Sequence, residues 1–379
     1  MIDLHSPSIN KSAINYFKKC IKSGWVSTGG NYVTQFEKEI AKFTGAKFAI
    51  ACNSGTSALH ISLKLAGVSP GDEVIAPSLT FVASINAILY NSCSPIFMDS
   101  DDYFNIDVDK TIEFLNKNTF KKNDLTYNKK TKKKISAILV THVWGHAADL
   151  RRLKKECDKK KIPIVEDASE SLGTKYKKNN KHTGTIGFLG TLSFNANKII
   201  TTGSGGMILT NDSRIAKKAK YLTTQAKDNS IFFVHNNVGY NYRMSNISAA
   251  LGISQIKQLK YFLKKKKMIR NFYEKHFKNS KNISLAESPS YSQNNNWLNL
   301  IRINKRFKLS RNQLIKKMIK NKISVRPVWK LNHLQKPFIK FQNFKIKNSL
   351  QLIKESLCLP SSPFLKKRDL KKIIKELNE

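Results

Sequence analysis

One lysine, Lys198, stands apart from the lysine clusters that occur throughout this chain. It lies in the segment SFNANKIITTGSGG, among small and polar residues, and three glycines follow it within eight positions. An amine can form a Schiff base with an aldehyde when its neighbours hold it in place and lower its pKa. Glycines beside it permit close backbone approach. Lys198 is therefore a candidate catalytic residue, and an ordinary surface lysine is the alternative.

Two further segments place polar groups where strands are expected to end. Asp167 closes the apolar run IPIVED, and Gly55, Thr56 and Ser57 lie in CNSGTSALH, where a strand gives way to a helix. Ligands of an open parallel sheet bind outside the carboxyl ends of its strands, and a helix N-terminus can hold a phosphate. Asp167 could bond a cationic ring nitrogen there. Helix capping is the alternative for both segments.

Other residues could complete such a site. Ser193 could contact a phosphate or a ring, Phe81 could cover a planar ring, and the turn YNYR (240–243) could bind an anion or simply begin a helix. Glu166 and Glu170 could equally be surface residues. An amine, an acid, an aromatic cover and a phosphate cup together predict a pyridoxal phosphate site. The glycines do not form G-x-G-x-x-G, and no G-x-x-x-x-G-K-[ST] occurs, so the nucleotide-binding motifs are excluded.

Helical patterns alternate with short apolar runs between residues 30 and 225. Helices are expected over 33–45 and 55–67. Strands are expected over 47–52, 73–78, 94–99, 135–142, 162–167, 190–195 and 205–211. This alternation predicts an α/β fold, a three-layer α/β/α arrangement around a mainly parallel sheet. The lysine-rich segment 121–134 is expected to be an exposed loop or insertion.

The pattern changes after about residue 235. One long helix is expected over 245–277, a strand over 296–303, a helix over 310–322 and a last helix from about residue 363. This indicates a smaller C-terminal α+β domain. We place the large domain, with an N-terminal arm, at residues 1–240. The small domain, with its linking helix, is expected at residues 241–379.

Composition limits the classes of protein that fit. The chain has 379 residues, of which 40% are hydrophobic, and no apolar run approaches the roughly 18 residues of a membrane span. Its first residues lack the layout of a signal peptide, so we expect a cytoplasmic protein without membrane association. Five cysteines are scattered singly without C-x-x-C spacing, which predicts reduced thiols and no metal site.

The charge is strongly positive, with 67 Lys and Arg against 26 Asp and Glu. The lysines are spread over the whole chain, and Asn and Ile are abundant too, a pattern typical of a compositional drift. No zinc finger, RNP-type motif or basic stripe interleaved with aromatic residues occurs, so nucleic acid is not the expected partner. A nucleic-acid or sensor protein on an enzyme-like scaffold stays as the alternative of another class.

Over nearly its whole length the chain resembles the DegT-type sugar aminotransferases, which have pyridoxal phosphate fold type I. The resemblance lies in the segments GWVSTGG, NSGTSALH, GDEVIAPSLTFVAS, HVWGHAADL, VEDASESLG, LSFNANKIITTGSGGMILTND and GYNYRMSNISAALG. Within this family the segments LSFNANKIITTG, THVWGHAADL and YLTTQAK are most similar to the legionaminic-acid-pathway branch. A few relatives carry His in place of the lysine and are dehydrases, and Lys198 argues against that activity.

The resemblance implies a role for each candidate around pyridoxal 5'-phosphate. Lys198 would bind its aldehyde and move protons, and Asp167 would keep its pyridine nitrogen protonated. Glu170, expected beside the ring, stands where many relatives carry Gln or His. The phosphate and the face of the ring would be contacted by Gly55, Thr56, Ser57, Ser193 and Phe81. Asn241 would reach the phosphate from the neighbouring subunit of a homodimer with shared active sites.

The resemblance also implies the substrates. L-glutamate would donate an amino group to C4 of a 4-keto-6-deoxy nucleotide sugar, in nonulosonic acid and surface polysaccharide (lipopolysaccharide) biosynthesis. The favoured acceptor is UDP-2-acetamido-4-keto-2,6-dideoxyhexose, and the alternative is GDP-4-keto-6-deoxymannose, which would give perosamine. Arg243 could bind the phosphates of the substrate. Trp329 and His333 match a family segment near the sugar pocket, although Trp329 could equally be a core residue.

Overall fold

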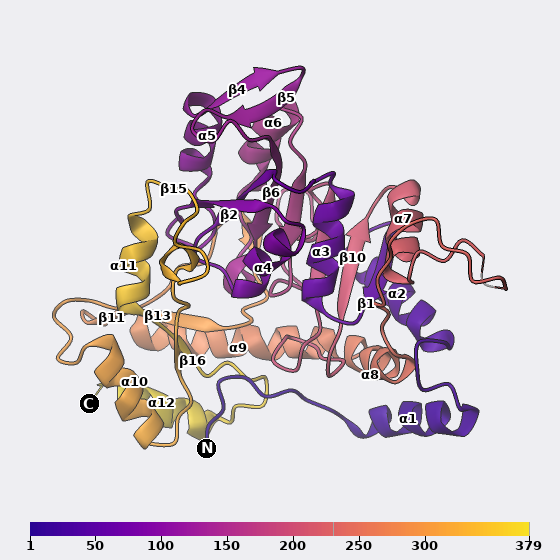
Figure 1. Cartoon of the computed structure of the whole chain (residues 1–379). Coiled ribbons are helices and arrows are strands. Elements are labelled where there is room, and N and C mark those ends of the chain that lie inside the picture. Colours follow the sequence, from indigo (N-terminus) through magenta and orange to yellow (C-terminus); the bar gives the residue numbers. More distant parts are fainter. Residues whose placement is uncertain (230, 379) are drawn as a thin grey trace.

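The computed structural model describes residues 1–229 and 231–378, and a large mixed sheet forms its centre (Figure 1). Within these residues the sheet has eight strands, in the order β1 (Phe48–Cys52), β10 (Gly206–Thr210), β9 (Leu189–Ser193), β7 (Ile164–Asp167), β6 (Ile135–Thr141), β2 (Glu73–Pro77), β3 (Ser94–Met98) and β15 (Asn343–Phe344). Strand β10 is antiparallel to both of its neighbours, and the other adjacent strands are parallel. The expected mainly parallel sheet is confirmed.

Helices cover both faces of this sheet, because successive apolar side chains of its strands point to opposite faces and both faces must be buried. In β2, Val74 and Ala76 pack with residues of α3 (Gly55–Leu65) and α4 (Val82–Tyr90). Ile75 points to the other face, toward α5 (Val108–Lys117) and α6 (Leu150–Lys159). In β10, Ile208 packs on α7 (Ser213–Thr223), whereas Met207 packs toward α2 (Asn31–Thr44) and α8 (Asn246–Ile256). The predicted three-layer arrangement is therefore present.

A smaller antiparallel sheet lies in the C-terminal part of the chain. Its strands follow the order β11 (Ile283–Leu285), β13 (Asn299–Ile303), β16 (Ser356–Leu359) and β14 (Arg326–Pro327). Apolar residues of this sheet pack on α9 (Leu259–Phe277), α10 (Arg311–Lys320) and α12 (Lys367–Asn378). The short strand β15 instead pairs with β3 at the edge of the large sheet, whereas α11 (Asn348–Glu355) packs on β13 and β16. The domain boundary at residue 240 stays a prediction.

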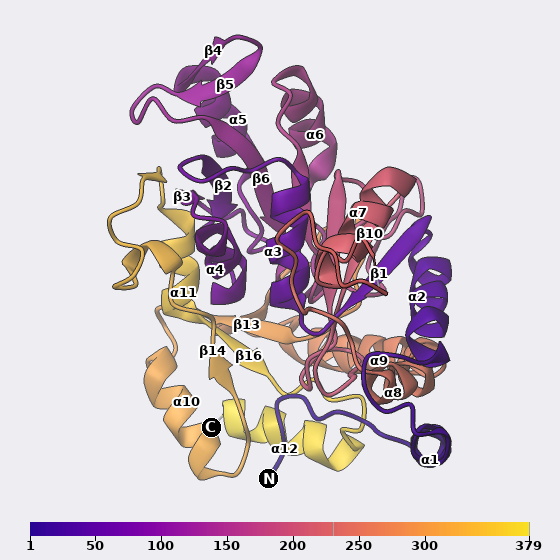
Figure 2. The same ribbon diagram turned by 45° about the vertical axis from the view of Figure 1, so that its right-hand side comes forward.

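The lysine-rich segment 121–134, for which an exposed loop or insertion was expected, contains most of a β-hairpin. Strands β4 (Thr119–Lys122) and β5 (Leu125–Asn128) pair antiparallel, and Asn123 and Asp124 connect them with φ angles of 49° and 61°. Two consecutive positive φ angles are typical of the type I′ turn, which suits the twist of a hairpin. Figures 1 and 2 show the hairpin standing out from the large sheet beside α5 and α6.

The expected single helix over 245–277 is two helices, α8 and α9, which meet at Lys257 and Gln258. The N–H of Gln258 donates to the carbonyl of Gln255 at 3.0 Å, so the chain makes a tight turn between them. The two helices have different surroundings, since α8 is buried along most of its length and α9 alternates buried and exposed residues. The turn lets each follow its own packing surface.

The N-terminal residues form an extended arm rather than a part of the large sheet. Ile2 pairs with Ile323 in the C-terminal part of the chain, and the N–H of Ser361 donates to the carbonyl of Leu4 at 2.7 Å. The arm leads to α1 (Lys11–Ser23), which lies beside α8 at the edge of the molecule (Figure 1). Among residues 1–229 and 231–378, no helix combines the length and the apolar character that crossing a membrane requires.

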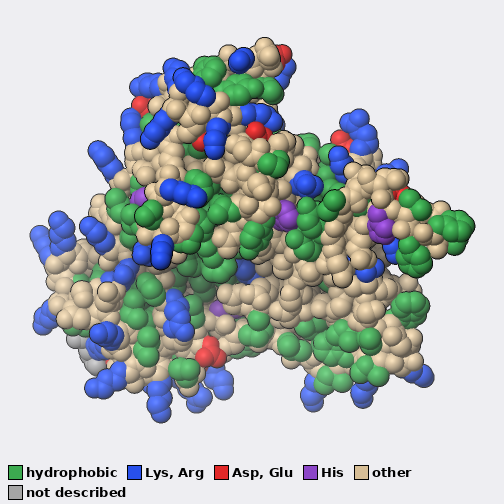
Figure 3. Space-filling model, in the orientation of Figure 1, with side chains coloured by type: hydrophobic (Ala, Val, Ile, Leu, Met, Phe, Trp, Pro, Cys, Tyr) green, Lys and Arg blue, Asp and Glu red, His purple; other side chains and the backbone are tan. Residues whose placement is uncertain are grey.

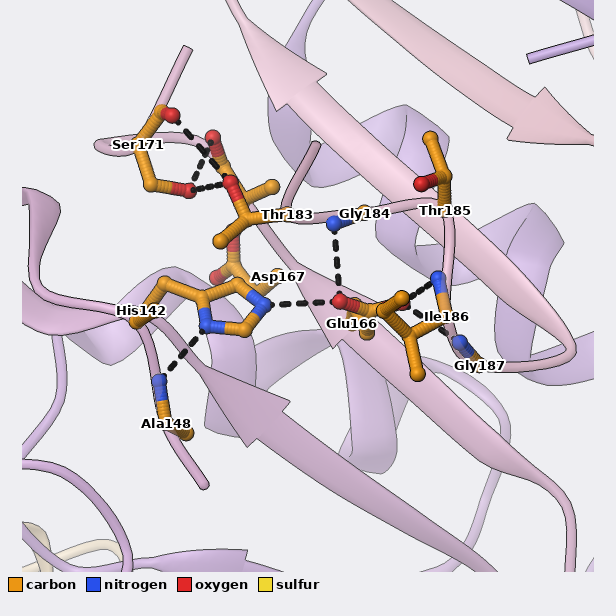
Figure 4. Close-up of polar contacts among 12 residues, drawn as sticks. His142, Ala148, Glu166, Asp167, Ser171, Thr183, Gly184, Thr185, Ile186 and Gly187 are labelled. Atoms are coloured by element: carbon orange, nitrogen blue, oxygen red, sulfur yellow. Dashed lines mark hydrogen bonds and ion pairs between the residues drawn. The ribbon is translucent and has the colours of Figure 1, made fainter. Parts of the chain in front are cut away.

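A buried carboxylate fixes the end of β7 to the loop before β9. Glu166 accepts hydrogen bonds from the N–H groups of Gly184, Ile186 and Gly187 at 2.7, 2.7 and 2.5 Å, and His142 Nε2 lies 2.8 Å from its Oε2 (Figure 4). Burial raises the pKa of Glu166, but His142 and the N–H groups outweigh burial and lower it overall. Glu166 is thus a structural residue and not one of the surface.

We predict that Glu166→Ala destabilises the fold by roughly 3–5 kcal/mol, because it leaves several buried donors without an acceptor. Urea unfolding at pH 7 measures the effect. Glu113→Ala is the control, since it removes only a partly exposed carboxylate paired with Lys117 and Lys345, and it should lower the free energy of unfolding far less than Glu166→Ala does. Similar losses in the two variants would contradict a structural role for Glu166.

Candidate active site

A cavity of about 430 Å³ opens at the carboxyl ends of β7 and β9. The ends of these strands and the starts of α3 and α4 line one part of the cavity. Trp297, Arg326 and Trp329, from the C-terminal part of the chain, line the rest. Eight of the residues singled out from the sequence line it, namely Gly55, Thr56, Phe81, Asp167, Glu170, Ser193, Lys198 and Trp329. The structure therefore brings most of the predicted site together in one place.

The amine of Lys198 is held at the wall of this cavity. Its Nζ donates to Oε1 of Glu170 at 3.4 Å and lies 4.4 Å from the centre of the Trp297 ring. The backbone N–H of Lys198 donates to the carbonyl of Asn195 at 2.9 Å, which tightens the turn that follows β9. Its side chain is 12% exposed, so the surface-lysine alternative does not apply. An amine held in this way can reach a molecule in the cavity.

Glu170 is also buried, and the surface alternative for this residue is wrong as well. Its Oε2 accepts a hydrogen bond from the backbone N–H of Trp144 at 2.8 Å, while Oε1 faces Lys198. Burial raises the pKa of Glu170 to about 7, and the Lys198 ammonium and the Trp144 N–H offset burial only in part. This carboxyl group therefore changes its charge near neutral pH, next to the candidate amine.

Asp167 places a second carboxylate in the cavity, at the end of β7. Its Oδ2 accepts a hydrogen bond from the Ser84 hydroxyl at 2.6 Å, and its Oδ1 accepts one from the Ser169 N–H at 3.1 Å. A turn, and not a helix, follows Asp167, so the capping alternative is wrong for this residue. Each carboxylate oxygen can accept a further bond. The group is placed to bond a cationic nitrogen inside the cavity.

The start of α3 forms the polar end of the cavity. The first N–H groups of a helix, here those of Gly55 and Thr56, have no acceptor within the helix and suit an anion. A Cβ on Gly55 would lie 2.7 Å from Cβ of Ser193, so only glycine lets these segments approach so closely. Ser57 does not line the cavity, because its N–H and hydroxyl face the capping Ser54 at 3.0 and 2.9 Å.

Aromatic rings form the opposite wall. The Phe81 ring is 51% exposed and lies 5.8 Å from the ring of Trp329, which stacks on Trp144 with centroids 4.0 Å apart. Trp329 is half-buried and lines the cavity, so it is not the core residue that the sequence left open. An exposed phenyl ring beside a cavity is available to cover a planar ligand.

Three other predicted residues lie outside this cavity in the protomer. Asn241 is exposed, and its Oδ1 accepts a hydrogen bond from Nε of Arg243 at 3.4 Å. Arg243 also donates to Oε1 of Gln225 at 3.2 Å. His333 belongs to the short helix η2 (Asn332–Leu334), and its Nδ1 lies 2.7 Å from the hydroxyl of Ser78. Their roles in binding stay predictions.

Sequence reasoning missed several residues that line the cavity. Trp144, in the short helix η1 (Val143–Gly145), and Trp297 form aromatic walls, and Ser84 bonds Asp167. Arg326 supplies a guanidinium group, with one hydrogen bond from Nη1 to the carbonyl of Val325 at 2.8 Å. Ser84 and Trp144 lie within segments that carry the family resemblance, but their residue types alone indicate no role. The four residues come from separate segments that only the folded chain brings to the cavity.

These residues fit pyridoxal phosphate. The cavity offers an amine for its aldehyde in Lys198, a carboxylate for its ring nitrogen in Asp167, and the start of α3 with Ser193 for its phosphate. Phe81 is exposed where a ring cover is needed. Gly206 keeps the phosphate end compact, since a Cβ there would lie 2.2 Å from the carbonyl of Ser54. The set of donors therefore agrees with the predicted cofactor.

Known proteins resemble this chain over nearly its whole length. The model of the DegT/DnrJ/EryC1/StrS aminotransferase family matches residues 7–378. GDP-perosamine synthase of Caulobacter vibrioides is 31% identical over 380 residues, covering 100% of this chain and 98% of the relative. UDP-4-amino-4,6-dideoxy-N-acetyl-beta-L-altrosamine transaminase of Campylobacter jejuni is 28% identical, covering 98% and 95%. Helicobacter pylori PseC, an aminotransferase of pseudoaminic acid biosynthesis, has the same fold, with a TM-score of 0.90 at 22% identity over 100% and 98% of the chains.

The pKa of Glu170 predicts a pH dependence of stability. The carboxyl titrates near 4.5 when unfolded and near 7 when folded, so its contribution is complete below pH 4.5 and is lost as the pH rises through 7. Glu170→Gln removes this dependence. We expect the difference in free energy of unfolding, wild type minus variant, to fall by up to about 3 kcal/mol between pH 4.5 and 8. Urea unfolding across this range measures it, and a constant difference would refute the raised pKa.

Proposed function

The chain belongs to the DegT/DnrJ/EryC1/StrS aminotransferase family, and on this premise we propose that it transfers the amino group of L-glutamate to C4 of a 4-keto-6-deoxy nucleotide sugar. Enzymes of this family depend on pyridoxal phosphate. The observation that carries the proposal is the placement of the Lys198 amine and the Asp167 carboxylate in one cavity, with the start of α3 at its polar end. We further expect the enzyme to act in the cytoplasm.

Different residues of the chain would then bind the cofactor, transfer protons and exclude water. Bound pyridoxal phosphate supplies an aldehyde and an electron-withdrawing ring, which allow an amino group to pass from one substrate to another. Lys198 would hold the cofactor and move a proton at Cα of glutamate and at C4 of the sugar. Asp167 would keep the ring nitrogen protonated. Phe81 and Trp329 would cover the cofactor and the sugar, and exclude water from the reacting atoms.

The positive charges in and near the cavity support the proposal that the substrate is an anion. Arg326 lines the cavity, and Arg243 lies on the surface outside it, so a guanidinium group is available for a phosphate or a carboxylate at two places. In the proposed complex Arg243 and His333 would bind the parts of the nucleotide sugar that extend beyond the cofactor. The positive net charge of +41 would also attract a substrate with two phosphates.

Two acceptors are supported by different observations. The segments LSFNANKIITTG, THVWGHAADL and YLTTQAK favour UDP-2-acetamido-4-keto-2,6-dideoxyhexose, as in legionaminic acid formation. The GDP-perosamine synthase of Caulobacter vibrioides, at 31% identity, is slightly more similar than the Campylobacter jejuni transaminase of a UDP-sugar, at 28%. That difference favours GDP-4-keto-6-deoxymannose as the second candidate. The enzyme would serve nonulosonic acid or surface polysaccharide synthesis in either case.

We also propose a homodimer in which each cofactor site uses both subunits. Asn241 is exposed and lies outside the cavity of its own protomer, directly after a segment with a strongly apolar surface. Ile231, Phe232 and Phe233 in that segment are 76%, 75% and 70% exposed, and apolar side chains are visible at the protruding tip in Figure 3. An exposed apolar cluster of this kind is typical of an interface.

The reaction is tested with both acceptors and labelled glutamate. We expect amino transfer to the UDP-sugar at a higher kcat/KM than to the GDP-sugar, together with a visible absorption band that glutamate abolishes. Lys198→Ala should lose the band and lower turnover by more than about a thousandfold. Lys217→Ala, an exposed lysine of α7, is the matched control. Turnover by Lys198→Ala at the rate of the control would overturn the proposed function, and a preference for the GDP-sugar would select the second acceptor.

The shared site is tested with Asn241→Ala. We expect this variant to retain pyridoxal phosphate about tenfold less tightly, because one hydrogen bond to the phosphate is lost. Asn279→Ala, an exposed residue of the small domain, should not change retention. Mixed dimers of Asn241→Ala and Lys198→Ala subunits should regain activity at limiting cofactor, because one of their two sites contains neither change. Unchanged retention and no recovery in the mixture would argue against shared sites.

A further inference from the structure

A second cavity, of about 600 Å³, lies at the surface beside the start of α6, and it shares no lining residue with the candidate active site. Its walls come from α6, from β8 (Lys175–Tyr176) with the loop after it, and from the residue before β12 (Ser292–Gln293). The rings of Tyr176 and Tyr291 and the side chains of Leu150 and Ile186 give the cavity an apolar interior. Its size is that of a small-molecule site.

Uncompensated positive charge surrounds this interior. Four of its lining cations form no ion pair with any described residue, namely Arg151, Lys155, Lys178 and Lys181. Its two acidic side chains are both engaged, since Asp158 pairs with Lys154 at 2.7 Å and Asp149 accepts a hydrogen bond from the Arg151 N–H at 3.3 Å. An apolar interior with a cationic rim is complementary to an aromatic anion.

The composition of the whole chain does not explain this concentration of charge. Lys and Arg are 67 of 379 residues, yet they are five of the twelve residues that line this cavity. The candidate active site has 25 lining residues and only two such cations, Lys198 and Arg326. The cationic rim is therefore a local feature of the second cavity.

Hydrogen bonds hold both tyrosine rings in place. The hydroxyl of Tyr176 donates to the carbonyl of Ala148 at 2.7 Å, and that of Tyr291 donates to the carbonyl of Ala147 at 2.9 Å. Strand β8 pairs with β12, which fixes Tyr176 opposite Ser292, next to Tyr291. Rings that are already ordered lose little conformational entropy when a ligand binds. The interior is thus a preformed surface for a planar group.

We propose that this cavity binds a nucleoside phosphate, with its base against the tyrosine rings and its phosphates among the cations of the rim. Aromatic side chains stack on nucleobases of any sequence, and Lys and Arg bind phosphate oxygens through charge-assisted hydrogen bonds. The proposal does not rest on the transaminase reaction, because no residue of the candidate active site takes part in it.

The position of the site also links it to the amine of Lys198. Ala147 follows Trp144 by three residues, and the Trp144 N–H is bonded to Glu170, the partner of Lys198. Tyr291 precedes Trp297, the ring beneath Lys198, by six residues. A ligand bound against the two ordered tyrosines restrains both of these segments further. Occupancy of the cavity is therefore expected to change the affinity for the amino donor, with the reciprocal effect required by linkage.

Calorimetric titration of the full-length protein with adenosine diphosphate and with inorganic pyrophosphate tests the binding site. Adenosine diphosphate is chosen because it shares its base with neither proposed acceptor. It should bind more tightly than pyrophosphate. The double variant Lys178→Glu/Lys181→Glu should weaken its binding at least about tenfold, since two charge-assisted contacts are lost. The matched pair Lys371→Glu/Lys372→Glu, on exposed positions of α12, makes the same change of charge and should leave the affinity within about twofold.

Three outcomes would overturn the site. Equal affinity for adenosine diphosphate and pyrophosphate would show that only charge is recognised, and so would an equal loss in the two double variants. Loss of binding in Arg243→Ala but not in Lys178→Glu/Lys181→Glu would place the nucleotide in the proposed nucleotide-sugar site instead. The link to Lys198 is tested by the KM for glutamate with and without adenosine diphosphate, and an unchanged KM would overturn that link.

Discussion

The buried carboxylate of Glu170 holds together three segments on which the candidate active site depends. Its Oε1 accepts from the Lys198 amine at 3.4 Å, its Oε2 accepts from the Trp144 N–H at 2.8 Å, and its backbone carbonyl accepts from Nδ2 of Asn295 at 2.8 Å. Asn295 in turn accepts from the N–H of Trp297, the ring beneath Lys198. The position of the amine is therefore set by a carboxyl group from the turn after β7 and by a turn from the C-terminal part.

Burial of the Glu170 carboxyl group next to the Lys198 amine changes how readily this carboxyl group ionises. Burial removes the Glu170 carboxyl group from water, and its pKa rises to about 7 as a result. The neighbouring Asp167 has only neutral partners in Ser84 and Ser169, so it keeps capacity for a cationic nitrogen. Asp167, at the end of β7, and Glu170, in the turn after it, thus have different roles because their surroundings differ. Glu166 on the same strand has a structural role, since its carboxylate is hydrogen-bonded to Gly184 and His142.

The large positive charge has more than one origin. Lys and Arg side chains lie around most of the outline of the molecule in Figure 3, in agreement with a drift in composition. The hairpin of β4 and β5 shows that a lysine-rich segment can still form regular structure. The second cavity differs, because its cations surround an apolar interior and its acids are already engaged. Local arrangement, and not total charge, separates a binding site from a solvated surface.

The sequence by itself determined the alternation of strands and helices and the mainly parallel sheet, because these follow from local periodicity. It also determined that Asp167, Lys198 and the start of α3 lie near strand ends, which the geometry of parallel strands brings to one edge of the sheet. Only the tertiary structure decided that Trp144, Trp297 and Arg326 join them, and that the helix expected over 245–277 turns at Lys257. These depend on contacts between segments more than a hundred residues apart, or on packing surfaces that no local pattern encodes.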